Sequence, residues 1–368
     1  MERLNVLVFG AGAIGTYVGG SLALAGHKVV FVEQPAAAQE LAQQGLRLEL
    51  MTTEGRIRNQ ERSSFSIPPS SFLAASSIDT ALEHGPFDVG IFALKSFDTA
   101  AALEAMRPHA GRLPPILCLS NGVDNEPALA ALLGADKVIA GTVTSAVGRR
   151  GIGSIVLERL RGIGLADGHP LSPALAEALD GAHLNPRLYP RPADMKWSKM
   201  LANLMVNASV AILDIPPRRV LAERPLFALE ISMLREALAV MRAQGIRVVN
   251  TPKPPVRLLA MAASWPAVLS HPLMVRAVGG GRGGKMPSFH IDLHSGRGRS
   301  EVEWLNGAVV RYGEQFGVRT PVNRVLNDTL LALTRGTVPL TEFSGRPEKL
   351  IEAVRNAQAE RKAPADNP

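Results

Sequence analysis

A glycine-rich turn directly after a short apolar run constrains the fold of this chain more than any other feature. Residues 4–9, LNVLVF, are typical of a buried parallel strand, and GAGAIG follows without a gap. A helix to about residue 25 and a strand at residues 28–32 come next. In that context the first glycine makes the turn, the second admits a pyrophosphate, and the third lets helix pack on strand. A tight turn in an unrelated α/β protein is the alternative. We expect a Rossmann-type dinucleotide-binding domain whose loop contains Gly10, Ala11, Gly12, Ala13, Ile14 and Gly15.

The end of the second strand bears on which dinucleotide is bound. Glu33 stands there, eighteen residues after Gly15, where a carboxylate accepts hydrogen bonds from the adenosine ribose and repels a 2'-phosphate. Gln34 follows where an arginine would be the natural phosphate partner. These two residues favour NADH over NADPH, and Arg47 or Lys28 is the alternative partner for a phosphate.

Two later strands end in polar residues. The apolar run at residues 87–94 leads into Lys95, and the run at residues 115–119 leads to Asn121. Because the carboxyl ends of parallel strands face the ligand crevice, we expect both residues to contact cofactor or substrate. A solvated lysine and an Asn-Gly turn are the alternatives.

The chain changes character near residue 190. Before it, the glycine-rich segment 148–168 predicts β-hairpins at the edge of the sheet, and a last strand is expected around residues 185–189. After it come long helical patterns at about 194–213, 224–244, 252–278 and 300–316. We predict a Rossmann domain over residues 1–190, an all-helical C-terminal domain over 191–347 and a frayed or disordered tail over 348–368.

A polar stripe interrupts the first of these helices. Lys199, Asn203 and Asn207 recur every four residues in WSKMLANLMVN, which lines them along one helix face. A buried ammonium or amide is costly unless it is paired, so we expect a substrate against this face. Lys196 shares the stripe and is the rival candidate.

A carboxylate elsewhere could complete the stripe. Glu301 begins an apolar helix, in a polar cluster that also contains Ser288 and Asp292. Most carboxylates at helix starts only complement the helix dipole. A catalytic lysine requires an acidic partner, however, and Glu301 is the candidate.

Two other motifs are weaker. Residues 279–285, GGGRGGK, imitate a phosphate-binding loop, but Met286 replaces the magnesium-binding Ser or Thr and no strand precedes them. His290 and His294 are four residues apart, but the sequence shows no third ligand and Asp292 lies off their face. We therefore expect neither an ATP site nor a metal site.

Composition narrows the class of protein. The net charge is +7 and the isoelectric point is near 9.8, yet the basic residues are scattered, which suits acidic metabolites as well as nucleic acid. Residues 4–26 carry no charge but contain six glycines, so a buried strand and helix explain them better than a membrane span. Cys118 is the single cysteine, which fits a reducing compartment. We expect a cytoplasmic protein that binds neither nucleic acid nor membranes.

Taken in order, the motifs resemble the ketopantoate reductase (2-dehydropantoate 2-reductase) family. The resemblance covers most of the chain: GAGAIG, Lys95, the SNG at 120–122, Trp197-Ser198-Lys199 with Asn203 and Asn207, Ser288 with Asp292, and Ser300-Glu301 ahead of residues 305–307. It implies a Rossmann domain bearing NADPH, a helical domain closing over it, and reduction of a 2-keto acid in the cleft.

The resemblance also implies roles. Lys199 matches the family's catalytic lysine, and the Trp-x-Lys register favours it over Lys196. Glu301 matches the essential glutamate. The groups that hold the substrate are matched by Asn121, Asn203, Asn207 and Ser288.

Three departures affect cofactor and substrate. Gln34 stands where the family commonly has an arginine, so the cofactor is NADPH by resemblance and NADH by the residues. The spacing between Asp292 and Glu301 is one residue longer than in the family, and the segment at about 251–285 is also longer than the family's. Both changes bear on the substrate pocket.

We hypothesise that the protein reduces 2-dehydropantoate to pantoate, a step in pantothenate and coenzyme A biosynthesis, with hydride from NAD(P)H and Lys199 as proton donor. A reductase of another 2-keto acid is the alternative. A non-catalytic dinucleotide-binding regulator is a third reading, which the set of Lys199, Asn203, Asn207 and Glu301 argues against. The expected binding partner is a small 2-keto acid substrate, and a homodimer is the oligomer that we predict.

Overall fold

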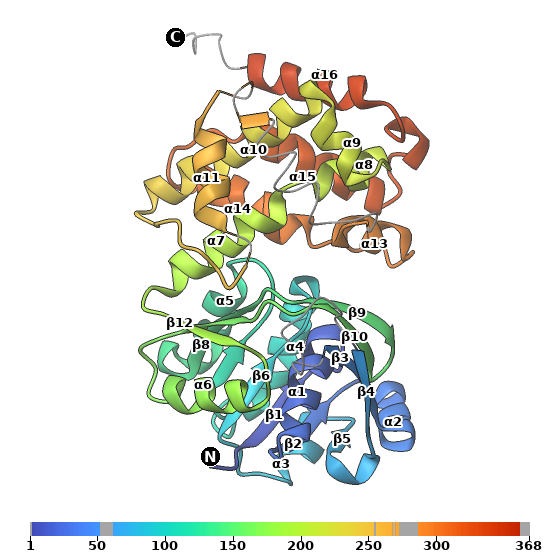
Figure 1. The fold of residues 1–368 in the computed structure, drawn as a ribbon, viewed down its shortest axis with the longest axis vertical. Helices are drawn as coiled ribbons and strands as arrows, with labels where there is room; N and C mark the ends of the chain where they lie inside the picture. Colours follow the sequence, from blue (N-terminus) through green and yellow to red (C-terminus); the bar gives the residue numbers. More distant parts are fainter. Residues whose placement is uncertain are drawn as a thin grey trace. The chain divides into compact units, whose positions relative to one another are not determined.

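The computed structural model describes residues 2–51, 62–253, 255–266, 268, 270–271 and 286–360. The chain forms two compact units, Met1–Lys196 with Thr251–Lys253, and Trp197–Asn250 with Pro254–Pro368 (Figure 1). The first is an α/β unit and the second is helical, as predicted. Helix α7 (Pro192–Leu204) contains the point where the chain passes from one unit to the other.

The α/β unit is built on an eight-stranded sheet in the order β12-β11-β8-β7-β6-β1-β2-β5. Neighbouring strands are parallel except for β11 and β8. Its central strands are apolar and buried on both faces, as a parallel sheet covered by helices requires. The strands are β1 (Asn5–Phe9), β2 (Lys28–Val32), β5 (Leu73–Ala75), β6 (Val89–Phe92), β7 (Ile116–Cys118), β8 (Val138–Val143), β11 (Ile163–Ala166) and β12 (Pro186–Tyr189).

Helix α1 (Ala13–Leu24) is the middle layer of this unit. It packs against β1, β2 and β6 on one side and against a second, four-stranded sheet on the other. A Cβ on Gly19 would lie 2.7 Å from Phe31 of the first sheet, and a Cβ on Gly20 would lie 2.9 Å from Leu48 of the second. The helix is therefore apolar on all sides because both of its faces are buried.

The second sheet corrects one prediction. Its order is β4-β3-β10-β9, with β3 (Leu46–Met51), β4 (Arg62–Ile67), β9 (Ala146–Gly151) and β10 (Ser154–Arg159). The hairpin of β9 and β10 was expected at the edge of the main sheet, but it pairs with β3 and covers α1. Only β11, from the same glycine-rich segment, joins the main sheet.

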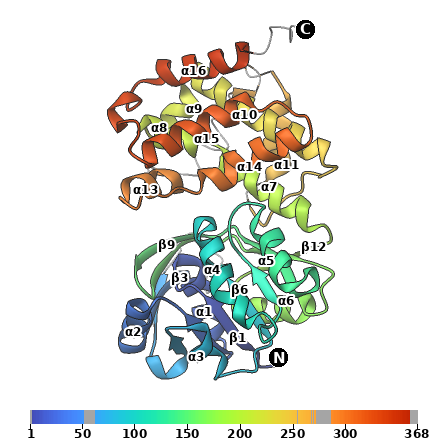
Figure 2. The ribbon, with the colours of Figure 1, turned by 180° about the vertical axis from the view of Figure 1, so that it is seen from behind.

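Further helices of the α/β unit connect its strands. Helices α4 and α5 lie side by side (Figure 2). The connecting helices are α2 (Pro35–Gln44), α3 (Ile78–Leu82), α4 (Thr99–Met106), α5 (Asn125–Leu133) and α6 (Ser172–Gly181).

The helical unit is organised around α10 (Arg224–Ala243), which contacts α9, α11, α14, α15 and α16. The segment expected to be a frayed or disordered tail contains helix α16, whose Leu350 and Val354 are buried. The phosphate-loop-like residues 279–285 lie outside the described residues. The other helices are α8 (Ala208–Leu213), α9 (Pro217–Ala222), α11 (Val256–Ser264), α13 (Ser288–His294), α14 (Val302–Gln315), α15 (Pro321–Thr334) and α16 (Pro347–Ala359).

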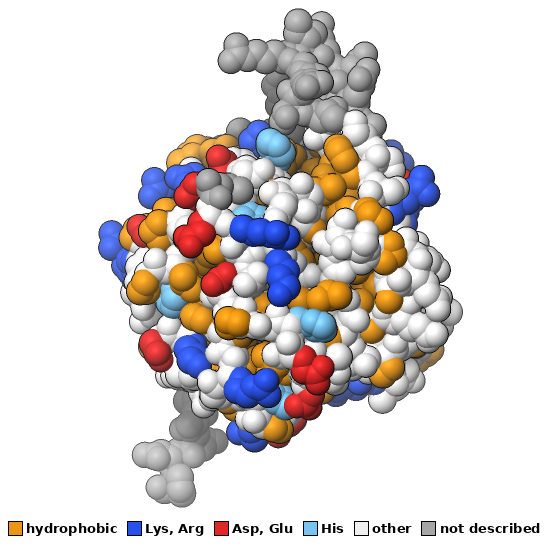
Figure 3. Space-filling view, turned by 90° about the horizontal axis from the view of Figure 1, so that it is seen from below, with side chains coloured by type: hydrophobic (Ala, Val, Ile, Leu, Met, Phe, Trp, Pro, Cys, Tyr) orange, Lys and Arg blue, Asp and Glu red, His pale blue; other side chains and the backbone are white. Residues whose placement is uncertain are grey.

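The distribution of charged side chains and the hydropathy of the helices can be described for the folded chain. On the face shown in Figure 3, basic side chains are interspersed with acidic and hydrophobic ones. Over the residues that the structure describes, no helix is both long and apolar enough to cross a bilayer.

Candidate active site

The carboxyl ends of four strands lie at one level of the main sheet. Phe9 at the end of β1 pairs with Val32 of β2 and with Phe92 of β6, and Phe92 pairs with Cys118 of β7. The chain leaves β1 toward β2 on one side, while β6 lies on the other, so β1 and β6 flank the topological switch point. Ligands of open α/β sheets bind at this place.

The glycine loop between β1 and α1 has the geometry that its spacing predicted. Gly10 has φ of 93°, in the left-handed region that favours glycine. A Cβ on Gly15 would lie 1.7 Å from the carbonyl oxygen of Gly10, so only glycine allows α1 to approach the strand. A Cβ on Gly12 would meet no atom within 4 Å. The loop is thus tightly packed at its two ends and open at the position where a pyrophosphate would need room.

Glu33 joins the end of β2 to this loop. Its Oε1 accepts a 2.5 Å hydrogen bond from the backbone N–H of Ala11, and its Oε2 accepts one of 3.1 Å from Gln34 N–H. The carboxylate therefore lies beside the glycine loop, where a ribose-binding acid is expected in a dinucleotide fold.

The loops after β6 and β7 are connected by a polar network. Asn121 contributes its carbonyl oxygen, which accepts hydrogen bonds from Ser96 Oγ at 2.8 Å and from Asn125 Nδ2 at 2.6 Å. Asn125 is 1% exposed and its Oδ1 accepts a 2.7 Å bond from Thr99 Oγ1. Lys95 occupies the N-cap position of the short 3-10 helix Ser96–Asp98 and is half-buried. Lys95 and Asn121 stay predicted site residues, whereas the sequence did not single out Ser96 and Asn125 of this network, whose only signal is a polar residue soon after a buried strand.

The side chain of Lys196 is buried in the α/β unit. Its Nζ donates to the carbonyl oxygens of Ser120 at 2.7 Å and Gly141 at 3.2 Å. It also lies 2.6 Å from Glu126 Oε1, an ion pair that is not aligned as a hydrogen bond. Burial, and then the Glu126 carboxylate, raise the pKa of the adjacent Cys118 thiol above its usual range. Lys196 therefore satisfies backbone oxygens and a buried acid at the carboxyl edge of the sheet.

Lys199 and Asn203 differ from the rest of their helix. Over residues 194–213, all of them described, these two side chains are the only ones that are not buried. Lys199 Nζ donates a 2.6 Å hydrogen bond to Asn203 Oδ1. The predicted helix face therefore exists for this pair, and it presents an ammonium oriented by an amide.

Asn207 was expected on the same helix face, but it lies outside helix α7. Helix α7 ends at Leu204, and Asn207 is the N-cap of α8. The predicted uninterrupted helix over 194–213 is wrong because the backbone turns at Val206, whose φ is 49°. Such a conformation is strained for a β-branched residue and requires support from its surroundings.

A buried acid supplies that support. Glu230 of α10 is 0% exposed, and its Oε2 accepts a 2.7 Å hydrogen bond from Val206 N–H. Its Oε1 accepts a short bond from Ser209 Oγ in α8. Sequence reasoning missed Glu230, which is an acidic residue in the buried face of a long amphipathic helix.

Asn207, at the start of α8, is hydrogen-bonded to Ser288, at the start of α13. Asn207 Nδ2 donates to Asn203 O at 3.1 Å and to Ser288 Oγ at 3.3 Å. Its Oδ1 accepts a 3.1 Å bond from Phe289 N–H. The structure therefore links four predicted residues, Lys199, Asn203, Asn207 and Ser288, in one hydrogen-bonded chain.

Glu301 lies on a different element. It is the N-cap of α14 and is 1% exposed. Helix α14 packs on α7 through an edge-to-face contact between Tyr312 and Trp197, with ring centroids 5.3 Å apart. A carboxyl group this buried requires polar partners, as a site residue or a structural cap would.

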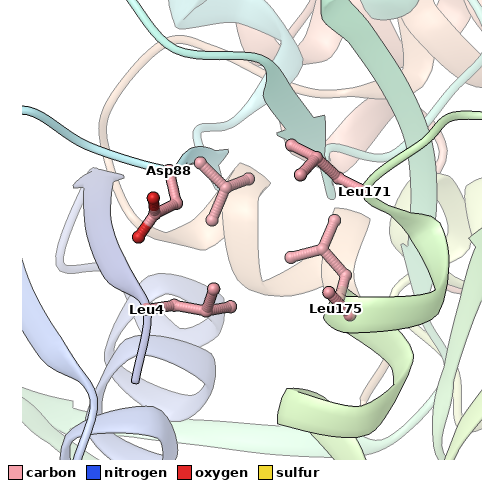
Figure 4. Close-up of a pocket in the computed structure, with 6 residues that line it drawn as sticks. Leu4, Asp88, Leu171 and Leu175 are labelled. Carbon is pink, nitrogen blue, oxygen red and sulfur yellow. The ribbon is translucent and has the colours of Figure 1, made fainter. Parts of the chain in front are cut away.

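A small pocket of the α/β unit lies away from these residues. Leu4 and Asp88 line it where β1 and β6 begin, together with Leu171 and Leu175 next to and within α6 (Figure 4). It is at the amino ends of the strands, whereas ligands of open α/β sheets bind beyond the carboxyl ends. We therefore assign it no role in the site.

The chain is similar to known proteins over most of its length. The family described as Ketopantoate reductase PanE/ApbA matches residues 6–167, and Ketopantoate reductase PanE/ApbA C terminal matches residues 193–334. A 2-dehydropantoate 2-reductase of Archaeoglobus fulgidus is 28% identical over 342 residues, which are 91% of this chain and 98% of that protein. One of Halobacterium salinarum is 28% identical over 343 residues, 88% of this chain and 97% of that protein.

Solved structures show the same fold. A PanE/ApbA family ketopantoate reductase from Ralstonia eutropha JMP134 superposes with a TM-score of 0.74 at 28% identity, covering 90% of this chain and 99% of that one. D-mandelate dehydrogenase with NADH and anilino(oxo)acetate superposes with a TM-score of 0.69 at 19% identity, with the same two coverages, and shares the fold. Because the two family matches together span most of the sequence, the chain belongs to the ketopantoate reductase PanE/ApbA family and is an oxidoreductase.

Proposed function

We propose that the protein reduces 2-dehydropantoate to pantoate with NAD(P)H, and that Lys199 is the proton donor. The observation that carries the assignment is the contrast between the two lysines of α7. Lys196 is buried against two carbonyls and Glu126, whereas Lys199 is partly exposed and oriented by Asn203. The names of the relatives support the substrate.

The chemistry explains the need for such a lysine. Bound NAD(P)H supplies the hydride that reduces C2 of the keto acid. Negative charge develops on the carbonyl oxygen, and an ammonium within hydrogen-bond reach stabilises it and transfers a proton to it. Lys199 is left neutral and takes its next proton from solvent.

The neighbouring polar groups would hold the substrate. Asn203 keeps the ammonium in one orientation through its Oδ1, and we assign its amide to the group that holds the substrate. Ser288 and Asn207 offer a hydroxyl and an amide to the carboxylate and hydroxyl of the substrate. We assign Glu301 to the substrate hydroxyl and to the orientation of Lys199, and Asn121 to substrate and nicotinamide.

The dinucleotide would bind along the carboxyl edge of the sheet. The loop Gly10–Gly15 would take the pyrophosphate, since Gly12 faces open space. Glu33 would accept hydrogen bonds from the adenosine ribose, which favours NADH, and Lys95 would supply positive charge near the phosphates or nicotinamide. The cytoplasmic location and the homodimer stay predictions.

A reductase of another 2-keto acid is the second candidate. The fold is shared with D-mandelate dehydrogenase, so the fold alone leaves the substrate open. The long segment at about 251–285, which the structure describes only in part, is one of the places where this sequence departs from the family. Its role in substrate choice stays a prediction.

Initial rates test the proposal directly. Oxidation of NADPH and of NADH is followed by absorbance with 2-dehydropantoate and with a panel of branched and aromatic 2-keto acids. The highest kcat/KM is expected for 2-dehydropantoate. A higher value for another keto acid would establish the second candidate. If tightly bound cofactor is oxidised by none of them, the protein is a regulator and the proposal is wrong.

A further inference from the structure

Three metal-ligating side chains of the helical unit converge outside the proposed active site. His290 and His294 lie on α13, and Asp214 ends α8. One imidazole nitrogen of each histidine and one carboxylate oxygen of Asp214 all lie within 4.8 Å of one another. The Nε2 atoms of His290 and His294 are 2.8 Å and 4.0 Å from the same atom, Asp214 Oδ1.

Local backbone structure creates this convergence. Residues four apart lie on one helix face, and the rings of His290 and His294 accordingly have centroids 4.2 Å apart. Asp214 has φ of 51° and ψ of 43°, the left-handed conformation that ends α8 and that aspartate tolerates better than most residues. Helices α8 and α13 pack together, which brings Asp214 to the histidines.

The sequence could not show the third ligand. Asp214 is seventy-six residues before His290, and its contact with that residue depends on how α8 and α13 pack. The nearer acid, Asp292, is on the same short helix but off the histidine face. The premise that the histidine pair has no third ligand therefore does not hold in the folded chain.

We propose that Asp214, His290 and His294 bind a divalent transition-metal ion of the zinc class. Two imidazoles and one carboxylate are a ligand set of Zn²⁺ sites, with water completing the coordination. Bonds of about 2.0–2.2 Å in tetrahedral geometry place ligand atoms about 3.3 Å apart. The distances found are 2.8 Å and 4.0 Å to Asp214 Oδ1, with all three ligand atoms within 4.8 Å of one another, so the side chains must shift to bind an ion. Those of Asp214 and His294 are 47% and 39% exposed, which leaves them room to do so.

Metal binding exchanges a proton for the ion. In the free protein a proton lies between His290 Nε2 and Asp214 Oδ1 in their 2.8 Å hydrogen bond. The ion takes its place between the same two atoms, and the proton moves to Nδ1 of a neutral ring or, from an imidazolium, to solvent, so no oxidant or reductant is needed.

The site would fix α13 relative to α8. Ser288, two residues before His290, bonds Asn207 at the start of α8, while Asp214 ends the same helix. The metal would thus be a second link between these two elements, separate from the Asn207–Ser288 bond. This role is structural, and it is measured by metal binding and melting temperature without turnover.

Direct binding measurements test the site. The purified full-length protein is treated with EDTA, dialysed and titrated with Zn²⁺ by calorimetry, and Co²⁺ is added separately as a spectroscopic probe of coordination. One equivalent of each ion is expected, with a rise in the melting temperature and visible Co²⁺ absorption typical of a low coordination number.

Two conservative variants and one control isolate the ligands. His294→Gln changes an exposed ligand that is only 4.0 Å from Asp214, and Asp214→Asn keeps an acceptor for His290. Each should weaken Zn²⁺ binding at least about tenfold and abolish the melting-temperature rise. His183→Asn, at an exposed histidine of the α/β unit with φ of 58°, should leave both unchanged.

The Zn²⁺ titrations of the wild type and the two variants can each contradict the proposed site. Unchanged Zn²⁺ affinity in His294→Gln and Asp214→Asn would overturn the site, as would a wild-type protein that takes up no metal. In the latter case the three residues form only the His290–Asp214 hydrogen bond and the neighbouring His294 contact. A reductase activity that is present or lost does not enter the test, so this inference and the proposed function can fail separately.

Discussion

Lys199 Nζ and Asn203 Oδ1 are joined by a 2.6 Å hydrogen bond one turn apart on α7. Lys196, one turn earlier on the same helix, instead contacts the main-chain oxygens of Ser120 and Gly141 and the carboxylate of Glu126. Two lysines three residues apart thus have different environments. This difference leads to opposite predictions for the two positions.

Removal of the Lys199 ammonium should slow turnover strongly without weakening cofactor binding. For Lys199→Ala we expect kcat to fall by between about a hundredfold and ten-thousandfold, the usual contribution of a positioned proton donor. The dissociation constant of the reduced cofactor, measured by nicotinamide fluorescence, should stay near the wild-type value. Added small primary amines should restore part of the rate. Near-normal turnover in this variant would remove Lys199 from the mechanism.

Loss of Asn203 should produce a smaller defect. Asn203→Ala removes the acceptor that orients the ammonium, and a hydrogen bond from a charged donor contributes about 1.5–3 kcal/mol, so we expect kcat to fall about tenfold to a hundredfold. Asn203→Gln, which keeps an amide at a different reach, is the matched comparison. Steady-state kinetics with 2-dehydropantoate measures both, and equal loss in Asn203→Ala and Lys199→Ala would contradict a positioning role.

Changes at Lys196 and Glu126 should affect stability instead. Their side chains are 6% and 14% exposed, and breaking a buried ion pair costs about 3–5 kcal/mol because one charge loses its partner. We expect Glu126→Gln and Lys196→Met each to lower the urea midpoint of the protein. The double variant should be less destabilised than the sum of the two. Strict additivity would show that the pair does not interact.

The sequence predicted the α/β unit well because its signals are local. Gly10 has the left-handed φ that a glycine turn predicts, and the close approach at Gly15 is to the carbonyl oxygen of Gly10, five residues earlier. The pair of Lys199 and Asn203 likewise needs only one turn of helix.

Residues whose roles depend on tertiary packing could not be predicted in this way. Periodicity continued the helix through Asn207, but Glu230 in α10 stabilises a left-handed turn at Val206 and ends it. Asp214 meets His290 through the packing of α8 on α13. The β9–β10 hairpin was recognised, but its pairing with β3 depends on α1 being buried on both faces. Register and partner choice over long separations are set by such packing.

Cofactor preference should follow the two residues that end β2. Glu33→Ala with Gln34→Arg removes the carboxylate that would repel a 2'-phosphate and adds a guanidinium to bind it, so the ratio of kcat/KM for NADPH to that for NADH should rise. Since Glu33 also accepts a bond from Ala11 N–H, Gln34→Arg alone is the control that keeps the loop intact. An unchanged ratio in the double variant would contradict the role assigned to Glu33.

Glu236 should make the stability of the helical unit depend on pH. Its carboxylate accepts bonds from the backbone N–H groups of Val322 and Asn323, at the start of α15, and from Asn323 Nδ2. Burial nevertheless raises the pKa of Glu236 to about 7, and the hydrogen bonds from Asn323 and Val322 only partly oppose this. The folded state therefore binds this proton more tightly than the unfolded state.

The sign of the pH dependence follows from that preference. The stabilising contribution is complete below about pH 4.5, the usual value for a glutamate, and is lost as pH rises through about 7, at most about 3 kcal/mol in all. Glu236→Gln has no proton to lose, so its unfolding free energy should fall less between pH 5 and pH 8 than that of the wild type. Urea unfolding at both pH values measures this, with Glu348→Gln, an exposed position on α16, as the control. Parallel pH profiles for wild type and Glu236→Gln would show that Glu236 has an ordinary pKa in the folded protein.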